Sequence, residues 1–230
     1  MRQSAGHHGA VKTVSQALLP TANDAAVSRL LLRRLGLVDY APTYAAMRRF
    51  SAERDANTPD ELWLLQHPPV YTLGQAGKME HLLEATEIPV EQTDRGGQIT
   101  YHGPGQIILY SLIDLKRRAL SIRRMVNILE QAIIDFLAEN GIEAARRTGA
   151  PGVYVGNAKI AALGLRVRNG CCYHGIALNV DLDLAPFSNI NPCGHAGLRV
   201  TRLTDLGVRI DCVTAGESIA TQITRLLRLA

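Results

Sequence analysis

A cysteine inside a short turn sequence is the most reactive group that the chain offers. The run Asn191-Pro192-Cys193-Gly194 places Cys193 on a loop, between a proline and a glycine. A loop cysteine beside a glycine leaves room for a substrate carbonyl, and nearby backbone N–H groups can stabilise an oxyanion. Most isolated cysteines are small buried hydrophobic residues, however, so position alone does not make Cys193 a nucleophile. Three other cysteines fit that buried interpretation better: Cys171, Cys172 and Cys212.

The second candidate is a single cation in an apolar run, Lys159 in Ala158-Lys159-Ile160-Ala161-Ala162-Leu163-Gly164. A free thiol, with a pKa of about 8.5, is only slightly ionised at pH 7, and an ordinary amine at about 10.4 is too basic to accept its proton. In an apolar pocket, desolvation lowers the pKa of an amine, and a nearby ammonium lowers that of a thiol. Lys159 is therefore a candidate acid/base partner for Cys193. A lysine on an edge strand equally protects a sheet against aggregation, and both interpretations stay open.

A glycine-rich segment, Arg95 to Gln106, holds four glycines and one proline around a tyrosine and a histidine. Glycine permits positive φ and close approach of the backbone to a ligand. The segment matches neither the phosphate-loop pattern nor the dinucleotide-binding pattern. We predict a binding loop, with an ordinary glycine-rich turn as the alternative. The binding interpretation rests on Arg95, Tyr101 and His102, which cluster on the segment.

Three histidines raise other possibilities. His102, His174 and His195 could join Cys193 in a metal site, but their separations match no zinc-binding spacing, and we expect no metal. A Cys–His dyad that uses His102 or His174 as its base is an alternative to the Cys–Lys pair.

The elements that position these groups include a three-stranded antiparallel meander over residues 152–155, 158–168 and 171–180. Gly156-Asn157 and Asn169-Gly170 are both typical two-residue hairpin turns flanked by apolar runs. If both turns are tight, Arg168 faces Cys171, and counting back places Gly164 opposite Gly175 and Ala162 opposite Ala177. By the same counting Lys159 faces Tyr154.

Small residues that face each other leave one patch of this sheet without side-chain bulk. An acyl chain or a thioester could lie on the patch, and close packing of a helix explains the pattern equally well. Strict alternation puts Lys159 on the face opposite Ala162 and Gly164. A β-bulge, or contacts made by the backbone, would remove that conflict.

The remaining elements follow from periodicity. Apolar runs predict buried strands over 62–66, 70–73 and 106–115. Helical spacing predicts a first helix from about Pro42 to Arg54 and a longer one over 121–140, which Gly141 ends. A last helix is expected after Thr214-Ala215-Gly216-Glu217, which reads as a capping box. Residues 1–29 show no sustained periodicity and predict a loosely ordered leader.

Bulk composition narrows the class of protein. The chain has 230 residues, is 47% hydrophobic and has a net charge of +4. It holds no apolar stretch near the roughly 20 residues of a membrane helix and no secretory signal pattern, so we expect a soluble cytoplasmic protein. The positive charge is spread over arginine doublets. Each doublet could simply be solvated surface, or together the doublets could steer an acidic partner towards the site. Nucleic acid is not expected, because no aromatic residues interleave with the arginines.

Four blocks, in order along the chain, resemble the lipoyl(octanoyl) transferases. They are His67-Pro68-Pro69-Val70-Tyr71-Thr72-Leu73-Gly74, Arg95 to Gln106, Lys159 to Gly164 with His174 to Asn179, and Pro186 to Gly194. Together they make a specific match from about residue 30 onward. Tyr154 stands where members of that family often carry tryptophan.

The resemblance implies an α+β fold like that of biotin and lipoate ligases, a mainly antiparallel mixed sheet with packed helices. It implies one catalytic domain over 30–230, and the predicted leader over 1–29 lies outside it. It also implies Cys193 as nucleophile and Lys159 as its acid/base partner. Acyl-substrate contacts are expected from Arg95 to His102 and from two tripeptides that the meander sets opposite each other: Ala162, Leu163 and Gly164, and Gly175, Ile176 and Ala177.

The implied reaction moves an octanoyl group from acyl carrier protein to a lysine of lipoyl domains through a cysteine thioester. It needs no ATP, no metal and no other cofactor. The acceptors would be the lipoyl domains of 2-oxoacid dehydrogenase complexes and the glycine cleavage H protein, with no nucleic acid and no membrane involved. The alternatives are an ATP-dependent lipoate or biotin-type ligase, a non-catalytic module that binds lipoyl domains and, last, a cysteine hydrolase.

Overall fold

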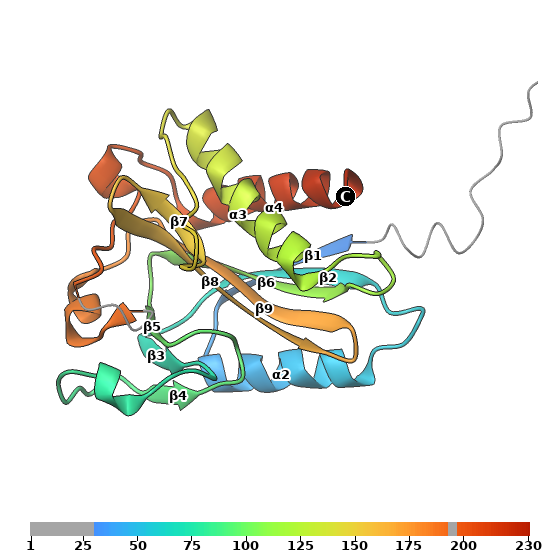
Figure 1. Cartoon of the computed structure of the whole chain (residues 1–230), viewed down its shortest axis with the longest axis horizontal. Helices are drawn as coiled ribbons and strands as arrows, with labels where there is room; N and C mark the ends of the chain where they lie inside the picture. Colours follow the sequence, from blue (N-terminus) through green and yellow to red (C-terminus); the bar gives the residue numbers. More distant parts are fainter. Residues whose placement is uncertain (1–29, 193–196) are drawn as a thin grey trace, which may run out of the picture.

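The computed structural model describes residues 30–192 and 197–230, which form two sheets and the helices that cover them (Figure 1). The larger sheet has six strands in the order β1 (Leu30–Leu37), β2 (Asp60–Gln66), β6 (Gln106–Asp114), β9 (Cys171–Asn179), β8 (Ala158–Arg168) and β7 (Gly152–Val155). β1 is parallel to β2, and the other neighbours are antiparallel.

The smaller sheet has three strands in the order β4 (Val90–Gln92), β3 (Val70–Leu73) and β5 (Ile99–His102), with β3 parallel to β4 and antiparallel to β5. β5 lies inside the segment that the sequence predicts as a binding loop, so four of its residues form a strand instead of a loop, while their role in binding stays a prediction. Apolar and polar residues do alternate along these four positions, but the glycines on both sides favour a loop prediction.

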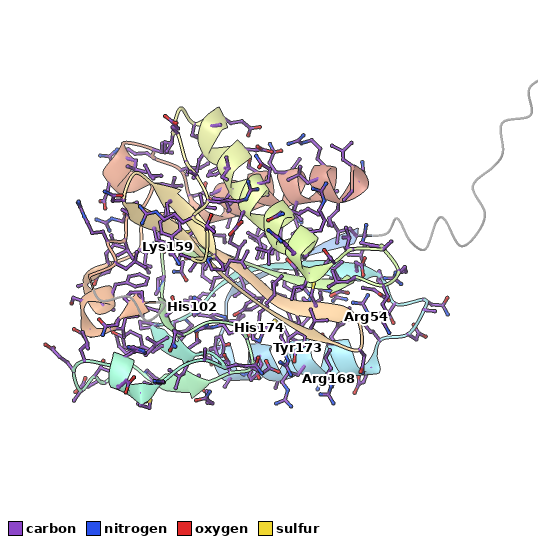
Figure 2. The ribbon with its side chains drawn as sticks, viewed as in Figure 1. Arg54, His102, Lys159, Arg168, Tyr173 and His174 are labelled. Atoms are coloured by element: carbon purple, nitrogen blue, oxygen red, sulfur yellow. The ribbon has the colours of Figure 1, made fainter. Side chains whose placement is uncertain are left out.

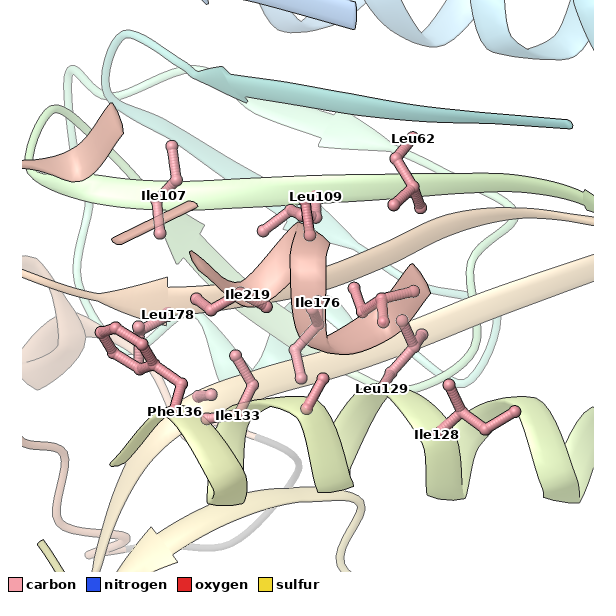
Figure 3. Packing of buried hydrophobic residues seen from close by; sticks show 14 of the residues in the cluster. Leu62, Ile107, Leu109, Ile128, Leu129, Ile133, Phe136, Ile176, Leu178 and Ile219 are labelled. Carbon is pink, nitrogen blue, oxygen red and sulfur yellow. The ribbon is translucent and has the colours of Figure 1, made fainter. Parts of the chain in front are cut away.

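Three helices cover the larger sheet. α3 (Ile122–Glu139) and α4 (Cys212–Arg228) pack together on one face, and α2 (Tyr40–Glu53) lies on the opposite face (Figure 1). Figure 3 shows the core between them, where Leu129 and Ile133 of α3 and Ile219 of α4 point at Leu109 and Ile176 of the sheet. Shorter 3₁₀ turns occupy the connections: η1 (Met79–His81), η2 (Ala185–Asn189) and η4 (Thr204–Leu206). None of these described helices is long and apolar enough to cross a membrane.

Local chemistry fixes where the helices begin and end. The hydroxyl of Ser121 accepts a hydrogen bond from the Arg124 N–H at 3.1 Å and caps α3, and Gly141 follows with φ of 75°. The expected capping box of α4 was misplaced. Asp211 is the N-cap and accepts a hydrogen bond from the Thr214 N–H at 2.9 Å. Thr214 thus lies in the first turn, because an extended Asp211 caps better than a threonine already in the helix.

The meander forms with the expected register: Arg168 pairs with Cys171, Gly164 with Gly175 and Ala162 with Ala177. The predicted pairing of Lys159 with Tyr154 is also confirmed.

A β-bulge lies between these pairs, since Val153 pairs with Ala161 while its neighbour Tyr154 pairs with Lys159. Lys159 and Ala162 therefore oppose residues that are two apart on β7, and both face the same side of the sheet. The bulge removes the conflict that strict alternation creates.

A buried carboxylate organises one end of the sheet. Asp60 is fully buried and forms ion pairs with Arg54 at 2.7 Å, Arg117 at 2.8 Å and Arg118 at 2.5 Å. Burial alone would raise the pKa of Asp60, but these arginines and the Asp114 N–H hold it below its usual value. The Arg117-Arg118 doublet is thus a structural ion-pair partner rather than part of a free surface field.

Replacing Asp60 tests this cluster. Asp60→Ala leaves three buried or nearly buried guanidinium groups without their counterion, and we expect the free energy of unfolding to fall by about 3–5 kcal/mol. Glu217→Ala is the control, because Glu217 pairs with Arg34 at the exposed surface and should contribute only about 0–1 kcal/mol. Urea unfolding at neutral pH measures both values. Equal losses would show that the cluster is no stronger than an exposed pair.

Candidate active site

One pocket gathers side chains from both sheets and from the start of α2. The residues predicted to bind substrate that line it are Arg95, Gly97, Gln98, Ile99, Thr100, His102, Ala162, Leu163, Gly164, Gly175, Ile176 and Ala177. Gly96 and Tyr101 do not line it. The Gly96 N–H donates to the Leu165 carbonyl at 3.0 Å, and the Tyr101 ring packs against Tyr71 and Phe187.

Sequence reasoning missed part of the lining. Tyr40, Ile108 and Tyr110 also face the pocket, and His174, considered only as a possible base, forms part of its wall. Tyr110 alternates with the core-facing Leu109 on a strand that is buried on both faces, so the apolar run gave no sign of which face is hollow. Tyr40 opens a helix whose buried face carries few large apolar residues.

Gly164 and Gly175, which pair with each other across β8 and β9, allow other parts of the backbone to approach the sheet closely. A Cβ at Gly175 would lie 1.9 Å from the Leu109 carbonyl oxygen, and one at Gly164 would lie 2.7 Å from the Gly96 carbonyl oxygen. The atoms that approach these positions are thus carbonyl groups of β6 and of the glycine-rich segment, and not a helix. This contact holds residues 95–98 against the sheet and brings them to the pocket.

Arg95 fixes the glycine-rich segment from inside. Its guanidinium donates to the Thr72 carbonyl at 2.5 Å, the Gln98 carbonyl at 2.7 Å and the Gly96 carbonyl at 3.0 Å. It also donates to the Thr72 hydroxyl at 2.9 Å and 3.1 Å. Because these N–H groups donate to the glycine-rich segment and to β3, the main role of Arg95 is to hold the two together and so to shape the pocket wall.

His102 lies at the end of β5 and is buried (Figure 2). Its Nδ1 is 2.6 Å from the Gln106 side-chain oxygen, and its Nε2 is 3.4 Å from the Thr72 hydroxyl. Burial, with a smaller effect from His67, lowers the pKa of His102 to about 3. The ring is therefore neutral at physiological pH and is a poor general base.

His174 has an unusual backbone for a residue inside a strand, with φ of 61°. Its partner Leu165 faces the core under α3, and strict alternation would send His174 there too. The positive φ instead turns the ring to the other face, where it packs against Tyr44 and Tyr110. Such a conformation costs about 1–3 kcal/mol and persists only where the surroundings enforce it.

The carboxylate of Asp94 holds the His174 ring in that position. Asp94 Oδ1 is 3.0 Å from His174 Nε2, and Asp94 Oδ2 accepts a hydrogen bond from the Tyr173 hydroxyl. Burial opposes the charge on Asp94, but hydrogen bonds from His174, Tyr173 and Tyr44 outweigh it and keep the pKa of Asp94 well below its usual value. Burial lowers the pKa of His174, although Asp94 acts in the opposite direction.

Lys159 is buried, and its Nζ donates to the Pro151 carbonyl at 3.0 Å (Figure 2). Its Nζ lies 5.2 Å from the centre of the Tyr154 ring. Gly152, with φ of 127°, makes room for it, because a Cβ there would lie 3.2 Å from Lys159 Cε. The Lys159 N–H also donates to the Arg199 carbonyl at 2.8 Å. The side chain is therefore held at the bulge of β8, next to the segment that follows residue 196.

Cys193 and His195 lie outside the described residues. Their flanks are described: the Asn191 N–H donates to the His81 carbonyl at 2.9 Å, and the Thr201 N–H donates to the Lys159 carbonyl at 3.0 Å. The other cysteines are thiols in apolar surroundings, and burial raises the pKa of Cys172 to about 12 and of Cys212 to about 11. Among the described residues no group of His, Cys, Asp or Glu has the arrangement of a metal site.

Comparison with known proteins places this architecture. Lipoate-protein ligase A bound with ATP superposes with a TM-score of 0.70 at 17% identity, covering 87% of this chain and 85% of that one. Biotin protein ligase from Aquifex aeolicus in complex with biotin and ATP gives a TM-score of 0.55 at 15% identity, covering 86% and 70%. The chain therefore has the α+β fold of the biotin and lipoate ligases, and the expected fold class is confirmed.

Sequence similarity is more specific. A model of the lipoyl protein ligase A/B catalytic domain matches residues 39–224. The octanoyltransferase of Aromatoleum aromaticum is 61% identical over 212 residues, covering 92% of each chain. That of Thiobacillus denitrificans is 65% identical over 179 residues, covering 78% of this chain and 82% of the relative. The chain belongs to the octanoyltransferases of the lipoyl protein ligase A/B catalytic domain family, which confirms the resemblance and the acyltransferase class.

The close approach of β6 and β9 gives a test of how the pocket is built. Gly175→Ala places a methyl group against the Leu109 carbonyl, where the backbone must move, and we expect a loss of about 3 kcal/mol or more in the free energy of unfolding. Gly96→Ala is the matched control, because a Cβ there would lie 3.3 Å from the Leu165 carbonyl oxygen, and it should cost less than about 1 kcal/mol. Chemical denaturation compares the two. A Gly175→Ala protein as stable as the control would contradict the account.

Proposed function

We propose that the chain transfers an octanoyl group from acyl carrier protein to a lysine of a lipoyl domain, in two steps through a thioester on Cys193. The identity to octanoyltransferases over most of both chains carries this proposal. The strand β8 carries a buried lysine at its bulge and also contributes residues to the pocket lining, which supports the chemistry. Residues 30–230 would form the single catalytic domain, with 1–29 as a leader and the cytoplasm as the site of action.

In the first step Lys159 takes the proton of Cys193, and the thiolate attacks the carbonyl carbon of the octanoyl thioester. Backbone N–H groups near Cys193 and at Leu163–Gly164 stabilise the oxyanion. Lys159 then protonates the departing phosphopantetheine thiolate, and octanoyl-Cys193 remains. Cys193 precedes Arg199 by six residues in the sequence, and the Arg199 carbonyl accepts the Lys159 N–H, which supports a pairing of the two groups.

In the second step Lys159 removes a proton from the incoming lysine of the lipoyl domain, and the free amine attacks the Cys193 thioester. The C–S bond breaks as the amide forms, Lys159 returns its proton to the Cys193 thiolate, and the amide nitrogen releases its second proton to solvent, so Lys159 ends as it began. Converting a thioester to an amide is favourable, and the scheme uses neither ATP nor a metal. The acceptors would be the lipoyl domains of 2-oxoacid dehydrogenase complexes and the glycine cleavage H protein.

The pocket would hold the acyl chain. Its floor is the small-residue patch of β8 and β9, and its walls include Tyr40, His102 and Tyr110. Neutral His102 and His174 suit an apolar ligand, because their pKa values are lowered and neither ring carries charge near pH 7. Their low basicity also favours Lys159 over a Cys–His dyad.

Intact mass spectrometry tests the covalent step. Mixing the protein with octanoyl–acyl carrier protein, without ATP or acceptor, should add one octanoyl group that maps to Cys193. Cys193→Ser should abolish the adduct, whereas Cys212→Ser, at a half-buried thiol on α4, should leave it unchanged. An acylation that requires ATP would instead support a ligase, and binding of lipoyl domains without transfer would support a non-catalytic module.

Lys159→Ala should slow acylation of Cys193 by about 10²–10⁴-fold, because the thiol loses its base. Single-turnover kinetics, with folding checked by circular dichroism, measure the effect. Wild-type rates in this variant would remove Lys159 from the mechanism without affecting Cys193.

Chain length tests the pocket. Ala177→Leu fills space over the patch, and we expect octanoyl transfer to fall at least about 10-fold while transfer of a butanoyl group survives. Ala45→Leu, on the exposed side of α2, is the matched control. If both acyl groups are affected equally, the acyl chain does not lie on this patch.

A further inference from the structure

A row of buried polar side chains crosses the molecule beside the pocket. Thr72 of β3, His102 of β5, Gln106 of β6 and Asn179 of β9 are all at most 8% exposed, and each is bonded to the next. The row ends at the backbone of Thr201, which follows the loop of Cys193 in sequence. Buried polar groups in such a row must be satisfied, so the direction of each hydrogen bond can be worked out.

The direction is set first at the Thr201 end. The Thr201 carbonyl can only accept, so the Asn179 amide nitrogen, 2.9 Å away, donates to it. Asn179 therefore turns its side-chain oxygen to Gln106, whose amide nitrogen donates to it at 2.9 Å and to the Tyr101 carbonyl at 3.2 Å. If the side-chain oxygen and nitrogen of either amide were exchanged, two donors or two acceptors would face each other.

The tautomer of His102 follows. The Gln106 oxygen lies 2.6 Å from His102 Nδ1, so that nitrogen carries the hydrogen and donates it. His102 Nε2 is left with a lone pair, towards which the Thr72 hydroxyl points at 3.4 Å. The Thr72 oxygen in turn accepts from Arg95, which can only donate. A permanent donor and a backbone carbonyl thus fix the row from its two ends.

The row also reaches Lys159. The Thr201 N–H donates to the Lys159 carbonyl at 3.0 Å, and the Lys159 N–H donates to the Arg199 carbonyl at 2.8 Å. One series of hydrogen bonds, each with a fixed donor and acceptor, thus joins Arg95 of the glycine-rich segment to the strand that carries Lys159.

We infer that Gln106 and Asn179 are positioning residues for the acyl-transfer reaction, which hold His102 as the neutral Nδ1–H tautomer on the pocket wall and tie Thr201 to the strand of Lys159. The inference rests on the proposed function of the same site. A neutral ring keeps the wall compatible with an apolar acyl chain, since an imidazolium there would lose its hydration when the chain enters. Gln106 serves acyl binding, and Asn179 serves the chemical step.

Other groups around His102 also favour the neutral ring. Tyr40 of α2 stacks on the ring at 6.2 Å between centres, and His67, after β2, lies edge-on at 6.1 Å. Arg95, before β5, and His174, of β9, both disfavour a second positive charge here. Gln106 is the group that favours a proton on Nδ1, and it does so without bringing a negative charge.

Nitrogen-15 NMR of histidine side chains tests the tautomer without any activity assay. The signal absent from a His102→Gln protein should show a protonated Nδ1 and a bare Nε2, with no titration between pH 5.5 and 8. An Nε2–H tautomer, or titration in that range, would overturn the inference. Because this readout needs no substrate, it stands even if octanoyl transfer fails.

Kinetics of the amide variants test the roles. Gln106→Glu places a carboxylate on Nδ1 and raises the pKa of His102, so below the raised pKa the pocket holds an imidazolium. The KM for octanoyl–acyl carrier protein should rise about 10-fold at pH 6 and return towards the wild-type value at pH 9, while kcat changes little. A change of about 10-fold corresponds to the free energy that one hydrogen bond contributes to binding. Gln222→Glu, exposed on α4, is the matched control and should leave the profile flat.

Asn179→Asp turns a donor towards the Thr201 carbonyl into an acceptor, and the two oxygens repel each other. We expect kcat of the folded protein to fall about 10-fold or more with KM nearly unchanged, and the melting temperature to fall as well, because the new carboxylate is buried. A loss confined to stability, with normal kcat in the remaining folded protein, would show that Asn179 is only structural. A pH-independent KM in Gln106→Glu would do the same for Gln106.

Discussion

The site depends on how closely β6, β9, β8 and the glycine-rich segment approach one another. At Gly175 and Gly164 neighbouring carbonyl groups occupy the space of a side chain, and no other residue type fits without moving the backbone. The approach leaves a shallow floor of small residues between α2 and the smaller sheet, and it brings Arg95 against β3. The pocket is thus a result of backbone packing, and the side chains around it refine its polarity.

Polarity is controlled in a way suited to an apolar ligand. The described part of the wall contains two histidines and an arginine, groups that would normally resist an acyl chain. His102 is neutral because burial and its amide partner settle its protonation, and Arg95 directs its donors to carbonyl groups of the protein. His174 is drawn to Asp94, at the expense of a strained backbone. Each polar group is satisfied internally, so the pocket presents mainly carbon to its contents.

Much of this arrangement was predictable from local rules. Two Gly–Asn or Asn–Gly turns set the register of β7, β8 and β9, and periodicity located α2, α3, β2, β3 and β6. The cap of α4 was misplaced by three residues, and β5 was not recognised inside its glycine-rich surroundings. The left-handed His174 and the linkage of Gln106 to Asn179 depend on contacts between distant strands, which no local pattern records. The ligand contacts themselves stay a prediction.

The fold alone does not decide between the candidate reactions. Structures that share it at 15–17% identity include a lipoate-protein ligase bound with ATP and a biotin protein ligase in complex with biotin and ATP, so the fold by itself is not evidence for one reaction. Which of these reactions a protein of this fold catalyses must therefore depend on a few residues of its site. A thioester donor already carries an activated acyl group, so a site that accepts it needs only a nucleophile and a base, and no place for a nucleotide. In the proposed reaction the nucleophile is Cys193, which lies outside the described residues, and the base is the buried Lys159, whose backbone N–H donates to the Arg199 carbonyl. The relatives at 61% and 65% identity are octanoyltransferases, and a nucleophile with a base is what the proposed transfer would require of this site.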